Sequence, residues 1–527
     1  MSEKQLTVRG VVTGIVGMLV ITASSMFLAL KIGTMPWPIL FSTILSMAIV
    51  GNFRGSSLQE INVTETIMAS GAMVAGGLVF TIPGIWIINP DAHLPMLPIV
   101  VMTVCGVLIG ILFSALYRKK LIVEQQLVFP MGNAAFETMT TGIKKGKDSL
   151  KLLLSMGFSA VFAIVRDAFG WFPSLLTVFQ GNGSVQPISL WLSPMALSIG
   201  AMIGKLSAFL WLGGALFGYL VLTPLGINLG FFTDFSASSA FRKNLGIGIM
   251  IGTGVGVFIK AVVDKCRKKK PAGAVRVKDF SPKTAGIVIS LVLLCSLLLA
   301  VGTELTFPQA LLATAGAGLT TLLSGMLTGQ CGTNPLEVFG ILVMLVSMML
   351  FKPSQMSLFL TTGVVSVACG LTGVLMSDFK SGYKLGTDHK QQLWGEAIGG
   401  VIGAVFSVFM LFVIKKSMGN FGTDLLPAPQ ASAVASMTSG IQNSPELLWG
   451  AAIGAFLYLL GIPSATLGLG FYLPIHISLS MGLGAILTMI LKKGDKISDK
   501  DVSLVSSGFL GGEGIIGVIV AICSMFG

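Results

Sequence analysis

Acidic side chains inside apolar stretches are the residues of this sequence that could do chemistry. Glu65 lies in "NVTETIMASG", Glu337 follows the pair Asn334 and Pro335, and Glu513 stands among glycines in "GGEGIIG". A charge inside a membrane-spanning helix costs about 2.5–3.5 kcal/mol, so each acid needs a reason to be there. Glu65 and Glu337 either bind a proton, a cation or a substrate amine, or are interfacial carboxylates stabilised by the positive end of a helix dipole. The glycines around Glu513 favour a functional role, because they let another backbone approach closely.

Other ionisable residues lie in or beside apolar stretches. His476 is the only histidine deep in such a stretch, and is either a hydrogen-bonded packing residue or a contact for a proton or metal. Arg166 and Asp167 are adjacent near the end of an apolar run, which favours an interfacial charge pair. Glu396 lies one turn into a predicted span. The candidates for ion coupling are Glu65, Glu137, His476 and Glu513.

No enzyme motif accompanies these residues. The sequence has no Walker motif for ATP hydrolysis, no nucleophile and base at motif spacing, and no residues with convincing metal-ligand spacing. None of the six cysteines forms a Cys-x-x-Cys pair, so small-residue packing explains them. We therefore expect a protein that is not an enzyme and that has no cofactor and no bound metal.

Membrane-spanning helices are the elements that must position the ionisable residues. The chain has 527 residues, of which 53% are hydrophobic and 11% charged, with a mean hydropathy of +0.88, against about 25% charged in a soluble domain. Continuous apolar runs of about 17–25 residues predict helices and not the alternating strands of a barrel. We expect an all-α polytopic membrane protein with about 16 transmembrane helices, the first of which follows no cleavable signal peptide.

Basic residues indicate how the helices are oriented. The net charge is +12, and Lys and Arg gather in short loops between apolar runs, where the positive-inside rule explains them without a nucleic-acid partner. Their alternation predicts a cytoplasmic N-terminus in a plasma membrane, or the inner membrane of a bacterium. The stretch "LKKGDKISDK" at 491–500 departs from this alternation, which weakens the topology of the last third.

Short sequence matches indicate an internal duplication. Gln-Gln-Leu recurs at 125 and 391, an offset of 391 − 125 = 266, and Asn-x-x-Glu recurs at 62 and 334, an offset of 334 − 62 = 272. We expect an N-terminal transmembrane half at 1–264, a basic cytoplasmic linker at 265–281 and a C-terminal transmembrane half at 282–527. Repeated halves suit a transporter that alternates about a central site.

Two similar segments are too polar to span a membrane alone. "LVFPMGNAAFETMTTGI" (127–143) and "LLPAPQASAVASMTSGI" (425–441) each contain an early proline and end almost identically. They are either re-entrant segments beside a binding site or amphipathic helices at the membrane surface. "FTIPGIWI" (80–87) and "LGLGFYLPIHISL" (467–479) are further breaks, whose freed carbonyls either bind ions or substrate or bond to neighbouring side chains in a plain kink.

The polar stretch "SDFKSGYKLGTDHKQQ" (377–392) interrupts the apolar runs of the second half. We expect a tight cytoplasmic loop there, between a span that ends near 376 and one that starts near 393. Its lysines serve as a topology anchor, or else Asp378, Lys380 and Tyr383 form a cytoplasmic gate.

Several of these motifs together resemble the oligopeptide transporter family, which includes the yellow stripe-like metal-chelate carriers. The resemblance covers "LTVRGVVTGIVG" near the start, "NVTETIMASGAMVAGGLVFTIP", "LVFPMGNAAFE", "SDFKSGYKLGTDHKQQ", "PAPQASAVASMTSGI" and "GEGIIGVIVAI". It implies about 16 spans and secondary uptake of peptides or peptide-like chelates, usually driven by protons. Glu65 and Met131 depart from the family pattern, as do Ser25, Met26 and Phe27, so the substrate can differ from that of well-known members.

We therefore predict a proton-coupled secondary importer of short peptides or peptide-like compounds such as glutathione or metal chelates. An ion channel or a small-ion carrier is the alternative, and an intramembrane enzyme is a third class that lacks the residues it needs. Besides lipid, the partners are the substrate and a coupling proton or cation, and a homo-oligomer stays open. The candidate substrate contacts are Asn62, Glu65, Asn133, Glu137, Asn334, Glu337 and Gln430.

Overall fold

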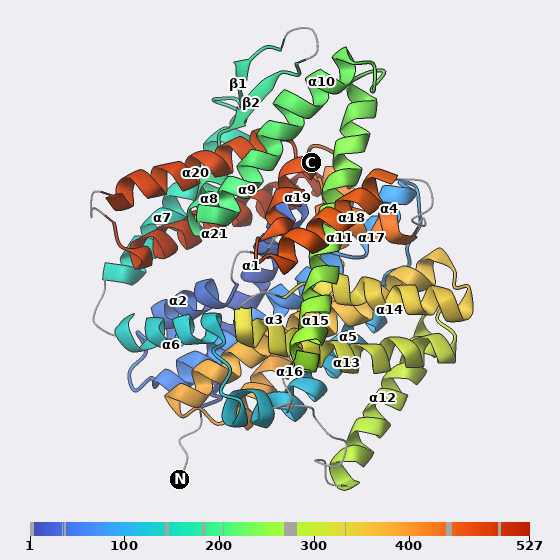
Figure 1. The fold of residues 1–527 in the computed structure, drawn as a ribbon. Helices are drawn as coiled ribbons and strands as arrows, with labels where there is room; N and C mark the ends of the chain where they lie inside the picture. Colours follow the sequence, from blue (N-terminus) through green and yellow to red (C-terminus); the bar gives the residue numbers. More distant parts are fainter. Residues whose placement is uncertain are drawn as a thin grey trace. The chain divides into compact units, whose positions relative to one another are not determined.

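Helices make up most of the computed structural model (Figure 1). It describes residues 5–33, 35, 38–142, 147–181, 185–203, 205–267, 282–331, 334–438, 445–493 and 497–526. Within these ranges, nine helices are long and apolar enough to cross a membrane. The prediction of an all-α polytopic membrane protein is confirmed, and the number of about 16 spans stays a prediction.

The helices gather into two compact units. Unit 1 comprises Met1–Ala29, Met35–Ser149 and Lys268–Phe421, and unit 2 comprises Leu30–Thr34, Leu150–Arg267 and Gly422–Gly527. Each unit takes residues from both sides of the predicted linker, so the units do not follow the sequence halves at 1–264 and 282–527. Residues 268–281 of that linker lie outside the described ranges.

Unit 1 contains the helices of the first part of each sequence half. They are α1 (Val8–Ile32, whose last residues belong to unit 2), α2 (Pro38–Val50), α3 (Leu58–Val79), α4 (Pro83–Ile88), α5 (Met96–Arg118), the π-helix η1 (Lys119–Glu124), α6 (Pro130–Gly142), α12 (Pro282–Gly302), α13 (Phe307–Cys331), α14 (Leu336–Phe351), α15 (Gln355–Leu385) and α16 (His389–Met418).

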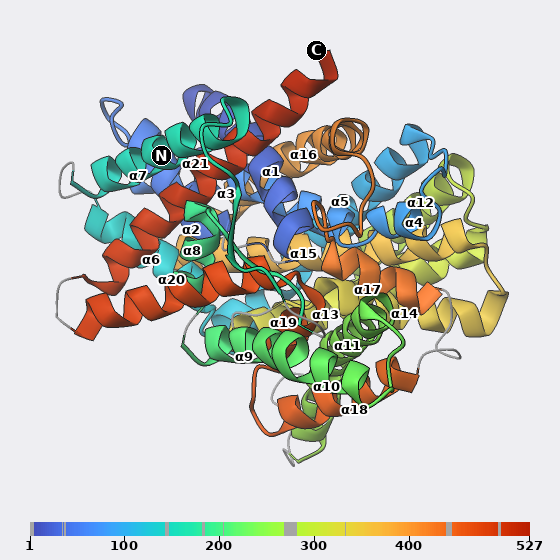
Figure 2. The ribbon, with the colours of Figure 1, turned by 90° about the horizontal axis from the view of Figure 1, so that it is seen from above.

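Unit 2 contains the helices of the later parts and one hairpin. They are α7 (Lys147–Ala163), η2 (Ile164–Ala168), β1 (Leu175–Phe179), β2 (Ile188–Trp191), α8 (Pro194–Met202), α9 (Lys205–Leu216), η3 (Phe217–Leu222), α10 (Thr223–Asn228), α11 (Phe235–Arg267), α17 (Pro429–Thr438), α18 (Pro445–Leu459), α19 (Ser464–Tyr472), α20 (Ile475–Lys493) and α21 (Asp499–Phe526). The strands are antiparallel, with Leu175 opposite Trp191. In Figure 2, α7 lies along α21, and the hydroxyl of Ser159 on α7 donates to the carbonyl of Phe509 on α21 at 2.7 Å.

The order of the helices repeats along the chain. The helices α1 and α13 are both 25 residues long, and their first positions have an offset of 307 − 8 = 299. The first positions of α6 and α17 have the same offset, 429 − 130 = 299. The helices α8 and α19 have 9 residues each, with an offset of 464 − 194 = 270. We call the helices α1 to α11 the first copy and the helices α13 to α21 the second copy, with α12 between them. The offset is smaller for the helices that follow the β1–β2 hairpin of the first copy. The short sequence matches at offsets of 266 and 272 do not agree with the offset of 299 between the first helices of the two copies.

Helix α15 is at the centre of unit 1 and packs against α3, α5, α13 and α14. Every residue from Ser357 to Gly382 is buried. Small residues allow α15 to pack closely against α3, because a Cβ built on Gly77 of α3 would lie only 2.6 Å from the Cα of Val367 on α15. The same holds for α3 and α16, where a Cβ on Gly403 would lie 2.6 Å from the Cα of Gly71. Close packing of this kind is typical of membrane helices.

The predicted loop at 377–392 is wrong for most of its length. Helix α15 continues through Asp378 and Lys380 to Leu385, where Gly386 ends it with a φ of 74°. Helix α16 begins at His389, and the side chain of Asp388 caps it by accepting from the amide of Lys390. The residues from Ser377 to Gly382 are buried in the continued helix, which sequence polarity alone does not reveal.

Candidate functional site

Three acidic side chains come together in unit 1 from three helices. Glu65 lies on α3, Asp378 on α15 and Glu396 on α16, and each is completely buried, at 0% exposure. The carboxyl groups of Glu65 and Asp378 are within hydrogen-bonding reach of each other, and Glu396 interacts electrostatically with both. We call Glu65, Asp378 and Glu396 the carboxyl triad.

Neutral polar side chains frame the triad. The hydroxyl of Ser42 on α2 donates to Glu65 at 3.1 Å, and Asn62, one turn before Glu65, approaches it at 3.5 Å. The amide of Gln392 on α16 donates to the side-chain oxygen of Asn62 at 3.0 Å and to the backbone carbonyl of Asp378 at 2.7 Å. These bonds join α2, α3, α15 and α16 around the acids, since residues three or four apart share a helix face.

The triad lacks donors for most of its oxygens. Both carboxyl oxygens of Asp378 and both of Glu396 have no hydrogen-bond partner among the described residues, and neither does the side-chain oxygen of Gln392. In the same ranges, no basic side chain forms an ion pair with any of the three acids. Because like charges repel strongly where burial limits screening, ionising all three carboxyl groups together is costly.

Glu60, also on α3, shows the opposite arrangement. It is 2% exposed, but Arg9 of α1 contacts both of its oxygens at 2.7 Å, and the hydroxyl of Thr7 donates to it at 2.6 Å. A carboxylate with a bidentate arginine is stable in its ionised form. Helix α3 therefore carries one paired acid and, later along its length, one acid without a basic partner.

The predicted gate residues do not form one surface. Asp378 belongs to the triad, Lys380 is 8% exposed, and Tyr383 is 48% exposed. Residues two apart on a helix point in different directions, so Asp378 and Lys380 face different neighbours. Helix α6 packs over this part of α15, since a Cβ on its Gly132 would lie 3.0 Å from the Cβ of Lys380.

The predicted substrate residues are dispersed, and only Asn62 and Glu65 lie at the triad. The amide of Asn133 on α6 donates to the carbonyl of Val128, while Glu137 on the same helix is exposed. Asn334 accepts from Ser324 and donates to the carbonyl of Cys369, just before Glu337 in the first turn of α14. In unit 2, Gln430 on α17 donates to the carbonyl of Gly33 at 3.0 Å.

The two polar, proline-containing segments form short helices with matching starts. Phe129 precedes α6 and Ala428 precedes α17, with left-handed φ values of 46° and 44°. The amide of Phe129 donates to the carbonyl of Gly329 at 2.9 Å, and that of Ala428 to the carbonyl of Leu30 at 2.8 Å. Such backbone strain gathers at functional sites. Whether these helices are re-entrant stays a prediction.

At the other two breaks, side chains bond to backbone carbonyls. At the first, the hydroxyl of Thr81 donates to the carbonyls of Gly77 and Leu78, between α3 and α4. At the second, between α19 and α20, Arg242 donates to the carbonyl of Phe471, and the hydroxyl of Tyr219 donates to that of Leu473 at 3.3 Å. Whether carbonyls freed at these breaks bind ions or substrate stays a prediction. His476, the second residue of α20, is half-buried.

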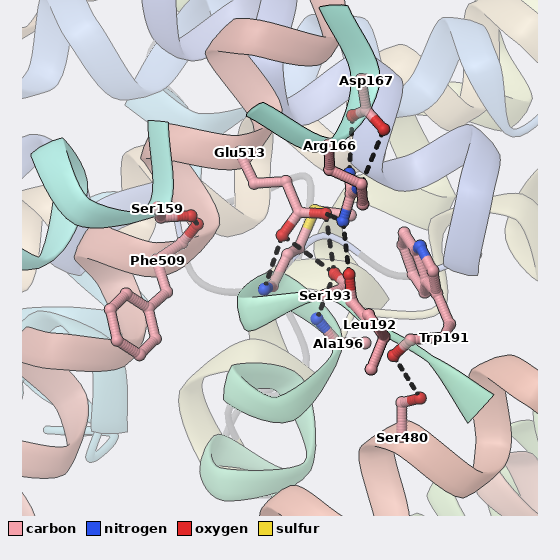
Figure 3. Close-up of polar contacts among 11 residues, drawn as sticks. Ser159, Arg166, Asp167, Trp191, Leu192, Ser193, Ala196, Ser480, Phe509 and Glu513 are labelled. Carbon is pink, nitrogen blue, oxygen red and sulfur yellow. Dashed lines mark hydrogen bonds and ion pairs between the residues drawn. The ribbon is translucent and has the colours of Figure 1, made fainter. Parts of the chain in front are cut away.

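Glu513 lies in a second polar cluster, within unit 2 (Figure 3). Arg166 of η2 contacts Asp167 at 2.6 Å and Glu513 of α21 at 2.8 Å, and it donates to the carbonyl of Leu192 at 2.6 Å. The hydroxyl of Ser193 donates to Glu513 at 2.8 Å, and the backbone amide of Met195 at 2.9 Å. The predicted pair of Arg166 and Asp167 is therefore present as part of a larger network that also holds Glu513, and its place at the membrane interface stays a prediction.

Sequence reasoning missed Glu396 and Gln392 as members of a site. Both were visible as polar residues on one face of an apolar helix, four positions apart. Their partners come from the distant helix α3, or from α15 where a loop was expected, so the pairing required the fold. Among the described residues, no group of His, Cys, Asp and Glu is placed to hold a metal ion.

Comparisons with known proteins identify the class of molecule. The family model described as "OPT oligopeptide transporter protein" matches residues 5–266 and 279–524. A Haemophilus influenzae protein named "Putative oligopeptide transporter" is 24% identical over 597 aligned residues, covering 94% of this chain and 92% of that protein. The family match spans both copies of the repeat and includes the triad. The chain belongs to the oligopeptide transporter family and is a multi-pass membrane transporter, not an enzyme.

Proposed function

We propose that this protein is a proton-coupled importer of short peptides, in which Glu65 takes up and releases the coupling proton. The observation that supports this best is the setting of Glu65, which is fully buried and has Asp378 beside it. Among the described residues, its hydrogen-bond donors are the neutral Ser42 and Asn62. An ionisable residue placed inside a membrane protein in this way is typical of proton relays in transporters.

Peptide-like compounds such as glutathione or a metal chelate belong to the same proposal, because they present the same amine and carboxylate groups. The short helices α6 and α17 offer polar side chains and helix N-termini that suit a substrate carboxylate. The proposed contacts there and at the start of α14 are Asn133, Glu137, Asn334, Glu337 and Gln430. The basic loops favour a plasma membrane or bacterial inner membrane with a cytoplasmic N-terminus.

Uptake of labelled di- to tetrapeptides into proteoliposomes, with an acidic exterior, tests the proposal. The wild type should accumulate peptide saturably, and glutathione or an iron chelate should compete if it is the substrate. Glu65→Gln should abolish accumulation driven by the gradient but keep peptide exchange at equal concentrations, because exchange needs no net proton movement.

The exposed acid Glu124, which lies near Lys119 at 3.8 Å, provides a matched control in the same unit. Glu124→Gln should leave accumulation unchanged. Normal accumulation by Glu65→Gln would contradict its role as the coupling acid. Conductance without saturable peptide uptake would instead favour an ion channel or a small-ion carrier.

A further inference from the structure

We propose that Glu65, Asp378 and Glu396 form one proton-binding site, in which Glu65 and Asp378 share a proton and Glu396 holds a second. Its part in transport rests on the proposed proton coupling, whereas the site itself is argued from geometry. The site spans α3, α15 and α16, the helices at the centre of unit 1.

A shared proton explains how Glu65 and Asp378 can lie together. Their carboxyl groups are within hydrogen-bonding reach, yet two carboxylates can only accept and would repel each other. Thr66 also lies within reach of Asp378, but its hydroxyl donates to the carbonyl of Asn62, at 3.1 Å. One proton on either carboxyl turns the pair into a donor and an acceptor and removes one of the two charges. Releasing that proton to water restores the carboxylate.

Gln392 is an independent sign that the site takes up a donor. Its side-chain oxygen is completely buried without a partner, while its nitrogen is held by Asn62 and by the carbonyl of Asp378. Glu396, four positions later on the same face of α16, has two further acceptors without donors. Buried polar atoms are rarely left unpaired, so protonated carboxyl groups, which can donate, suit a site where acceptors outnumber donors.

Charged groups on the surrounding helices do not balance the triad. In the described part of the chain, α2 and α13 carry none. Glu60 is paired with Arg9, and the electrostatic interactions that each acid of the triad makes with charged groups are with other acids of the triad. The other charged groups on elements packed around the site are Arg118, Glu137, Glu337, Lys380, Lys384, His389, Lys390, Lys415 and Lys416. Further titratable groups on these elements are Cys105, Tyr117, Cys369 and Tyr383.

Infrared spectroscopy of the purified protein tests the site without any transport. Protonated carboxyl groups absorb apart from carboxylates, and their bands shift in D₂O. At neutral pH the wild type should show such bands. Glu65→Gln or Asp378→Asn should each remove the band of the shared proton, because an amide can then donate to the remaining carboxylate. Glu396→Gln should remove a different band.

Glu60→Gln is the matched control, because Glu60 is equally buried on α3 but is paired with Arg9. It should leave the protonated-acid bands unchanged. A wild type without such bands at neutral pH, or bands that survive all three substitutions in the triad, would overturn the site. A spectrum that loses a band in Glu65→Gln but loses none in Glu396→Gln would overturn the second proton.

Thermal unfolding provides a second readout. The unfolding temperature of the wild type should fall as the pH rises, because deprotonation leaves unbalanced charge in the folded protein. The triple amide variant should lose most of this slope, and an unchanged slope would overturn the proposal. Bands without peptide accumulation by the wild type would refute the proposed function alone, whereas accumulation without bands would refute the site alone.

Discussion

Phe129 and Ala428 make the same contact in the two copies of the repeat, at an offset of 428 − 129 = 299. Each has a left-handed backbone before a proline, and each donates its amide to a carbonyl near the C-terminal end of the first helix of the other copy. The accepting residues, Leu30 and Gly329, have the same offset, 329 − 30 = 299. The two copies are thus tied to each other by a reciprocal pair of hydrogen bonds.

Ala428→Gly should stabilise the protein. Glycine adopts a φ of 44° without strain, whereas alanine there costs about 1 kcal/mol. Thermal unfolding in detergent measures the gain. Ala433→Gly, in the middle of α17 with an ordinary helical backbone, should cost about 1 kcal/mol instead. A loss of stability in both variants would show that Ala428 is not strained.

Glu513→Gln should destabilise the fold without abolishing proton coupling. The substitution removes the ion pair with Arg166 but keeps a side chain that Ser193 and the amide of Met195 can still contact. Arg166 retains Asp167, so we expect a loss of about 1–3 kcal/mol. Calorimetric or fluorescence-detected unfolding measures this loss. Full stability combined with lost gradient-driven uptake would instead restore Glu513 as a coupling residue.

Arg242→Met should loosen the break between α19 and α20. The carbonyl of Phe471 would lose its donor while buried, at a cost of about 1–3 kcal/mol. Tyr219→Phe removes only a longer bond to the carbonyl of Leu473, at 3.3 Å, and should cost about 1 kcal/mol or less. Unfolding temperatures of the two variants give the comparison. A larger loss for Tyr219→Phe would assign the break to the tyrosine.

Gly403→Ala should disrupt the contact between α16 and α3. The added methyl would lie 2.6 Å from the Cα of Gly71, so a helix must shift, at a cost of about 1–3 kcal/mol. Gly286→Ala on α12 is the control, because its Cβ would meet nothing within 4 Å. That variant should gain up to about 1 kcal/mol from helix propensity. Equal stability of the two variants, measured by thermal unfolding, would contradict the close packing.

Composition and apolar run length were enough to predict the helical membrane fold, because lipid leaves few alternatives for a spanning segment. The early proline and polar residues of 127–143 and 425–441 correctly marked two segments that break the pattern of long helices. The offset between the two copies was not predictable from the sequence. Tripeptide matches such as those at Gln125 and Gln391 arise by chance, whereas the offset is seen in the lengths and first positions of corresponding helices, which the structure provides.

The site was only half predictable. Glu65 was visible because an acid in an apolar stretch needs a reason. Asp378 was assigned to a loop, because the polar sequence after Met376 reads as solvent-exposed until its partners are known. The contacts of Asp378 with Glu65 and Gln392 depend on helices that are distant in the sequence or packed side by side, and no local pattern encodes them.

The complete enclosure of α15 has a consequence for biosynthesis. Helix α15 is long and apolar enough to cross a membrane, but it also carries Asp378 and Lys380, and every residue from Ser357 to Gly382 is buried. Helices α3, α5, α13 and α14 precede it from the ribosome, but Gln392 of α16, which binds the carbonyl of Asp378, emerges afterwards. In a nascent chain that stops before α16, the buried carbonyl of Asp378 therefore lacks the donor that Gln392 provides, so the packing around this end of α15 is complete only after α16 has been synthesised.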